Sequence, residues 1–182
     1  MTAPPVYTKT AIALHWVIAL LILVAFPLGI YMADLPLSPT KLKLFASHKS
    51  IGVTVFLFVL ARVVWRLTHA VPAPPAGMPG WQQRAASITH GLLYVLILAV
   101  PLVGWLASSA DGMQTVYFRV LPLPDLLPKD KALGEVLGKV HGAMAFTMAL
   151  LVIAHIAASL KHHLVDRDDV LKRMLPWYKG PI

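Results

Sequence analysis

Two histidines, His141 and His155, enclose the uncharged stretch HGAMAFTMALLVIAH. Fourteen residues make close to four turns of α-helix, so both imidazoles lie on nearly the same face. At about 1.5 Å per residue they are roughly 21 Å apart along the axis, within a bilayer core roughly 30 Å thick. A polar ring inside a membrane is costly and needs a partner. Haem iron is such a partner, and two stacked haems give electrons a route across the membrane.

The composition is that of an integral membrane protein. Of 182 residues, 58% are hydrophobic and 13% are charged, about half the charged fraction of a typical soluble domain. The absence of cysteine excludes disulfides, iron–sulfur clusters, Cys-ligated zinc and covalent CxxCH haem attachment. Any haem must therefore be held by other ligands, of which histidine is the expected one. The net charge of +8 suggests basic residues that contact the anionic lipid surface, because the sequence contains no nucleic-acid-binding motif.

Apolar runs predict one domain over residues 1–182, an all-α membrane protein built as a four-transmembrane-helix bundle. The first run is longer than the apolar region of a signal peptide, so we interpret it as a helix. Asp130 is a candidate cap for an extension into the last helix. The positive-inside rule places both termini in the cytoplasm, with 9 Lys and Arg on that side and 7 on the other. The expected helices span about residues 10–33, 48–68, 84–109 and 137–161.

Four histidines match in depth as two pairs. His15 and His155 lie at one level near the chain termini, and His48 and His141 open their helices at the opposite level. Two pairs on three helices are what two haems with two histidine ligands each require. Scattered interfacial histidines are the alternative, and zinc is disfavoured because neither level offers the usual closed set of Cys and His. His90 is level with His15, so it is an alternative ligand in place of that residue.

Other polar residues align with the level near the termini. Arg62 follows His48 by fourteen residues, so it shares that face at the far level, where a cation can pair with a haem propionate. The alternative is an arginine that snorkels from a helix end. His162 follows His155 by two turns. Together with His90 it predicts a proton-donating pocket beside the haem, suited to a quinone carbonyl.

At the other level, Lys49 and Lys139 lie next to the expected ligands and belong to a basic rim that would steer a small anion. Propionate pairing and solvated loop charge are the alternatives. Gly52, Gly138 and Gly142 are near the same histidines, where small residues would let a flat macrocycle approach the backbone. Ordinary close packing of membrane helices also favours glycine.

Seven segments make the chain resemble the bacterial cytochrome b561 family of four-helix di-haem membrane proteins: ALHWVIALLI, FASHKSIGV, VLARVVWRL, ITHGLLYVLILAVPLVGW, KVHGAMAF, HIAASLKHH and LKRMLPW. The resemblance implies a ubiquinone site on the cytoplasmic side, with His90 and His162 at the matching positions. It also implies two b haems, on the cytoplasmic and periplasmic sides, held respectively by His15 with His155 and by His48 with His141.

The resemblance further implies a haem b oxidoreductase of the bacterial inner membrane that oxidises superoxide to dioxygen and passes the electrons to ubiquinone. Two imidazoles on each iron leave no open position, so such haems transfer electrons and do not bind oxygen. An alternative is a quinone-linked electron carrier that serves a dehydrogenase or cytochrome partner. A third interpretation, a haem-free transporter or proton channel that uses the same histidines, predicts a preparation without haem bands in the visible spectrum.

Overall fold

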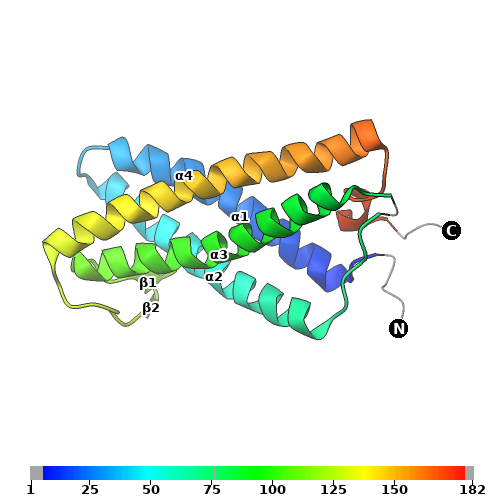
Figure 1. The fold of residues 1–182 in the computed structure, drawn as a ribbon. Coiled ribbons are helices and arrows are strands. Elements are labelled where there is room, and N and C mark those ends of the chain that lie inside the picture. Colours follow the sequence, from blue (N-terminus) through cyan, green and yellow to red (C-terminus); the bar gives the residue numbers. More distant parts are fainter. Residues whose placement is uncertain (1–5, 76, 179–182) are drawn as a thin grey trace.

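The structure is a computed structural model that describes residues 6–75 and 77–178. Four long helices run side by side, and α1 begins at the same end of the bundle at which α4 ends (Figure 1). We call this the terminal end and the opposite one the hairpin end. Each helix is long and apolar enough to cross a membrane, which confirms the predicted four-helix bundle. The helices are α1 (Lys9–Asp34), α2 (Pro39–Thr68), α3 (Gly80–Ala110) and α4 (Lys131–Lys161).

α2 begins at Pro39 and not near residue 48, so most of the expected loop is helical. Ser38 caps this start, because its hydroxyl oxygen accepts a hydrogen bond from the backbone N–H of Lys41 at 3.2 Å. Proline suits the first helical position, where a backbone N–H has no intrahelical partner. The predicted start therefore failed because hydropathy does not register a polar but well-capped first turn.

α3 and α4 also begin earlier than about residues 84 and 137. α3 starts at Gly80, directly after a proline. α4 starts at Lys131, where the Asp130 carboxylate accepts a hydrogen bond from the N–H of Leu133 at 3.1 Å. This is the cap that the sequence suggested, and it extends α4 well beyond the apolar run.

The buried core lies between the two histidine levels and draws on all four helices. Met148 is seven residues from both His141 and His155, so it lies about halfway between the levels. The buried members are aliphatic or thioether side chains, so the middle of the bundle is packed mainly with apolar groups. They are Ile18, Ile22, Val55, Val59, Leu93, Val100 and Met148.

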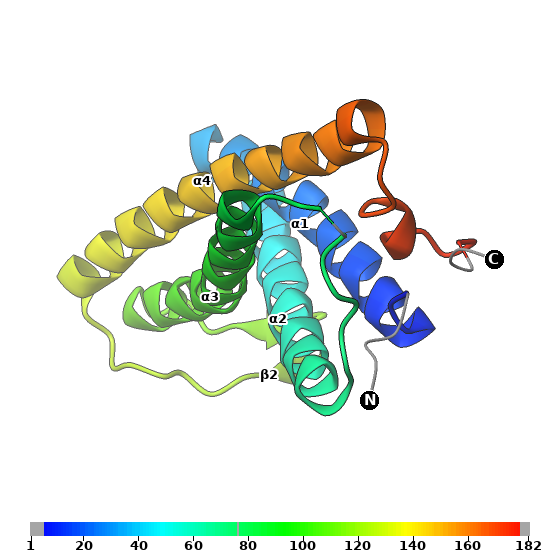
Figure 2. The same cartoon turned by 45° about the vertical axis from the view of Figure 1, so that its right-hand side comes forward.

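Short segments complete the two ends. Between α3 and α4, strands β1 (Val116–Tyr117) and β2 (Leu121–Pro122) form an antiparallel hairpin beside α2 (Figure 1). After α4 come a π-helical turn, η1 (His162–Asp166), and a 3-10 turn, η2 (Lys172–Met174). The segment with η2 folds back beside α1 (Figure 2), where Trp16 Nε1 donates to the Met174 carbonyl at 2.7 Å. The C-terminal segment therefore covers the bundle next to His15.

Candidate haem-binding site

At the hairpin end the structure brings together His48 of α2 and His141 of α4. Their ring centroids are 6.1 Å apart and their planes are inclined by 86°. Two imidazoles that bind one metal ion from opposite sides, each at about 2 Å, have centroids about 6 Å apart. The two rings are therefore separated by the distance that one shared iron atom requires.

The ring nitrogens at this level also suit a bound metal. His141 Nδ1 lies 2.9 Å from the Val100 carbonyl, and when it donates that bond, Nε2 is left as a metal ligand. His48 Nδ1 is buried and has no hydrogen-bond partner among residues 6–75 and 77–178. A buried polar nitrogen without a partner is costly. The backbone carbonyl of Ala25 on α1 is the acceptor beside this ring, and donation from Nδ1 to it would leave Nε2 to bind a metal, as in His141.

A glycine of the preceding helix lies against each of these two rings. A β-carbon on Gly29 of α1 would be 3.1 Å from His48 Cε1, and one on Gly104 of α3 would be 2.9 Å from His141 Cε1 and Nδ1. A methyl group at position 104 would displace the His141 ring, and one at position 29 would crowd the His48 ring. By contrast, β-carbons on Gly138 and Gly142 would meet no described atom within 4 Å.

At the terminal end, His155 of α4 has two histidine neighbours. The ring centroid of His15 on α1 is 6.3 Å away, and that of His90 on α3 is 5.3 Å away. The first separation suits a shared iron atom, whereas the second is shorter than about 6 Å. The geometry favours His15 over His90 as the second ligand and leaves His90 beside the pair with an exposed side chain.

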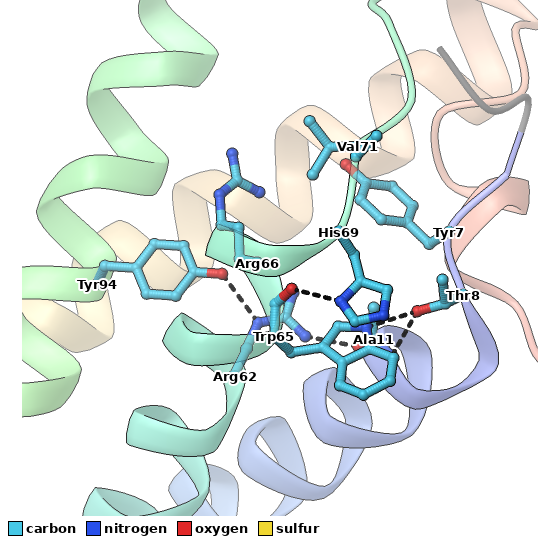
Figure 3. A pocket seen from close by; sticks show the side chains of 10 residues that line it. Tyr7, Thr8, Ala11, Arg62, Trp65, Arg66, His69, Val71 and Tyr94 are labelled. Carbon is cyan, nitrogen blue, oxygen red and sulfur yellow. Dashed lines mark hydrogen bonds between the residues drawn. The ribbon is translucent and has the colours of Figure 1, made fainter. Parts of the chain in front are cut away.

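Arg62 of α2 connects two helices next to this pair. Its Nη1 donates to the Ala11 carbonyl at 2.6 Å, and its Nε donates to the Tyr94 hydroxyl at 3.1 Å (Figure 3). Ala11 is one turn before His15, and Tyr94 is one turn after His90. The guanidinium is therefore fixed within a turn of the terminal-end histidines, at the level that the fourteen-residue spacing predicted.

A small pocket opens beside Arg62, between the start of α1 and the end of α2 (Figure 3). Arg66 adds a second cation, 5.8 Å from the centre of the Tyr94 ring. His69, which had no predicted role, stacks on Trp65 with the ring centroids 3.8 Å apart. The residues that line the pocket include two arginines and no carboxylate. Its charge suits an anionic group such as a haem propionate.

His162 lies in η1, immediately beyond α4, and two carboxylates hold it. Its Nδ1 is 2.6 Å from Asp168 Oδ2 and 3.2 Å from Asp166 Oδ2, and its side chain is 13% exposed. With Nδ1 bonded to Asp168, Nε2 is the nitrogen left to exchange a proton. Within the described part of the chain no hydrogen bond or ring contact joins His162 to His90, which lies against His155.

The two lysines expected to steer an anion differ in their surroundings. Lys49 Nζ donates to the Met113 carbonyl at 2.8 Å, which ties α2 to the loop after α3. Lys139 is exposed on α4. Lys49 therefore has a structural contact of its own, and Lys139 is the more accessible of the two charges.

A known protein family matches the part of the chain that contains both histidine pairs. The family described as prokaryotic cytochrome b561 matches residues 6–177, which include all four helices and all eight histidines. The chain belongs to the prokaryotic cytochrome b561 family. It is therefore a multi-pass membrane protein of the bacterial type that binds haem b and transfers electrons.

Three curated relatives are similar over nearly their full length. "Cytochrome b561 homolog 2" of Escherichia coli K12 is 33% identical over 94% of this chain and 92% of its own. "Cytochrome b561 homolog 1" of the same organism is 30% identical, with 93% and 97% covered. "Probable superoxide oxidase CybB" of Yersinia pestis is 25% identical, with 96% and 98% covered.

In this cytochrome b561, sequence reasoning missed the two glycines that contact the hairpin-end imidazoles. It singled out Gly52, Gly138 and Gly142 because they are near histidines in the chain, whereas Gly29 and Gly104 reach them from neighbouring helices. A signal was available. Glycine weakens the interior of a helix, so its presence there indicates a close approach. Both glycines also follow the in-helix prolines of α1 and α3 by two or three residues.

Proposed function

We propose that this cytochrome b561 holds two b haems, one between His48 and His141 and one between His15 and His155. The observation that carries the proposal is the presence of two imidazole pairs, with centroid separations of 6.1 and 6.3 Å, at opposite ends of α4. When bound, haems with two histidine ligands supply one-electron transfer and leave no open position for oxygen.

The proposed reaction moves electrons from superoxide at the hairpin end to ubiquinone at the terminal end. Two superoxide anions give two dioxygen molecules and two electrons, and one ubiquinone takes up those electrons with two protons. Lys139 and Lys49 would attract the anion. The proposed orientation in the inner membrane, with both termini cytoplasmic, then puts superoxide on the periplasmic side.

The chain's own residues would supply the protons at the terminal end. His162 is the proposed donor, because Asp168 holds its Nδ1 and leaves Nε2 to transfer a proton. His90 is exposed beside His155, where its ring can donate a hydrogen bond to a quinone carbonyl. The two histidines have separate contacts, so they would act on the quinone from different elements, α3 and η1.

Stopped-flow mixing tests the substrate. Superoxide is expected to reduce the purified, oxidised protein as fast as the two can be mixed, and a soluble ubiquinone analogue is then expected to reoxidise it. The physical reason is that a basic rim raises the encounter rate of a small anion. The measurement is the absorbance of the reduced haem band. Slow reduction in protein with full haem content would remove superoxide as the substrate and leave the haem sites standing.

A second candidate function is a quinone-linked electron carrier that serves a dehydrogenase or cytochrome. Two observations favour it. Lys49 is bonded to the Met113 carbonyl, which occupies one of its three N–H donors and restrains the side chain, so it is less free to bind an anion. The relatives with 33% and 30% identity are named cytochrome b561 homologs, while the relative named as a probable superoxide oxidase is 25% identical. Slow reduction by superoxide together with fast reduction by such a partner would support this function.

The positive charge of Arg62 should raise the midpoint potential of the terminal-end haem. We expect Arg62→Gln to lower that potential by roughly 50 mV or more, because at an effective dielectric of about 20 a cation within roughly 15 Å of the iron stabilises its reduced form by at least about 1 kcal/mol. Redox titration followed in the visible spectrum measures it. Arg84→Gln is the matched control, since it removes the same charge from an exposed position at the start of α3. Equal shifts in both variants would argue against a specific role for Arg62.

A further inference from the structure

The hairpin between α3 and α4 lies along α2 and is bonded to it at two points. The backbone N–H of Phe118 donates to Ser50 Oγ at 3.0 Å, and the hydroxyls of Tyr117 and Thr54 are 3.1 Å apart. Phe118 and Arg119 form the tight turn and have positive φ angles of 47° and 61°. These contacts fix the hairpin tip, residues 118–121, against the side of the bundle.

The contact points lie well inside α2 and not beyond its end. Ser50 follows His48 by two residues and Thr54 follows it by six, both in the direction of the terminal end. The tip therefore lies level with the hairpin-end histidines or slightly deeper. Figure 1 shows β1 and β2 beside the long helices, inside the length of the bundle.

Three of the four side chains of the tip are apolar and exposed. Phe118 is 63% exposed, Val120 82% and Leu121 56%. Three such residues within four positions are unfavourable on a surface that faces water, whereas aromatic and aliphatic side chains are favoured at the membrane interface. Arg119, between them, has a stem long enough to carry its charge toward lipid phosphates.

The first three N–H groups of the tip have acceptors within the protein. Phe118 N–H is bonded to Ser50, Arg119 N–H donates to the Val116 carbonyl at 3.2 Å, and Val120 N–H donates to the Tyr117 carbonyl at 3.1 Å. The next strand ends in proline, which has no N–H. Turn bonds of this kind also form in water, but they are required of a segment in contact with lipid, because lipid tails supply no hydrogen-bond partners.

We propose that the tip, residues 118–121, inserts into the bilayer at the boundary between headgroups and acyl chains, beside α2. Its occupant is lipid, because the exposed apolar surface is continuous in depth with the apolar surface of the transmembrane helices. This inference depends on the membrane fold and on neither the haem count nor the substrate. The hairpin then anchors the loop over α2 and holds Lys49 and Met113 at a fixed height.

Site-directed spin labelling tests the proposal directly, because the chain contains no cysteine. A nitroxide is attached to Val120→Cys in the full-length, haem-loaded protein in liposomes, and its accessibility to oxygen is compared with that to a polar nickel chelate. Oxygen concentrates in lipid and the chelate stays in water. The oxygen-to-nickel ratio is therefore expected to be several-fold higher at position 120 than at Lys131→Cys, the control at the exposed start of α4.

Two results would overturn the proposal. A ratio at position 120 as low as at position 131 would place the tip in water. Low accessibility to both reagents that appears only in native membranes would assign the tip to a protein partner. An unchanged visible spectrum shows that the labelled protein is folded, and Phe118→Cys is a second reporter on the same tip if the first label perturbs it.

Discussion

The His15→Ala protein is expected to carry one haem b per chain, and the His90→Ala protein two. Both residues lie next to His155, but only His15 has the ring separation, 6.3 Å, that suits a shared iron atom. At 5.3 Å, the ring of His90 is closer to that of His155 than two ligands of one iron atom would be. The measurement is the ratio of haem, as its pyridine complex, to protein.

His48→Ala is the matched comparison at the other level. It is expected to remove one haem as well, and the double variant with His15→Ala both. Each single variant should retain its other haem, because the core of Val59 and Met148 separates the two levels. The opposite result, with haem lost from His90→Ala and kept in His15→Ala, would reverse the choice of ligand. Two haems in all three single variants would refute the proposed sites.

The Gly104→Ala protein is expected to lose much of its hairpin-end haem. The added methyl would lie 2.9 Å from two atoms of the His141 ring, closer than carbon atoms pack without displacement. The ring cannot easily turn aside, since its Nδ1 is bonded to the Val100 carbonyl. Displacement by even a few tenths of an ångström misdirects Nε2, and supporting contacts of this kind typically change metal affinity 10–100-fold. The haem-to-protein ratio should fall from 2 toward 1.

Gly91→Ala is the control for Gly104→Ala, since it makes the same change in the same helix at a position where the methyl meets nothing within 4 Å. It is expected to keep both haems and to be slightly more stable, because alanine favours helix over glycine by about 1 kcal/mol. If Gly104→Ala kept its full haem content, the close contact with His141 would not be needed for binding.

The four helices could be predicted because the membrane leaves little choice: a long apolar run must be a helix that pairs its own backbone groups. The depth of each histidine followed from its position within a helix of fixed rise. The starts of α2 and α4 did not follow, because Ser38 and Asp130 extend them through polar turns that hydropathy does not reward. Caps of this kind act on hydrogen bonds and not on burial.

Contacts between helices were less predictable, because they depend on how far each helix is rotated about its axis. Spacing along one chain segment could relate His141 to His155, but it could not show that Gly104 of α3 lies against His141. The expected His90–His162 pocket stays a prediction, and the separate contacts of its two histidines could not be foreseen for a related reason. The chain turns from α-helix to π-helix at His162, which brings its ring to Asp168. No periodicity in the sequence predicts this change from α-helix to π-helix.

The apolar core between the histidine levels has a consequence for energy conversion. With both proposed haems bound, electrons would cross this apolar segment without an accompanying ion. Such a transfer is electrogenic, and the voltage across the membrane would act on every turnover at about 2.3 kcal/mol per charge per 100 mV for a complete crossing. In the proposed orientation the electrons travel toward the negative cytoplasm. A large transmembrane voltage would then slow the reaction, and loss of that voltage would speed it.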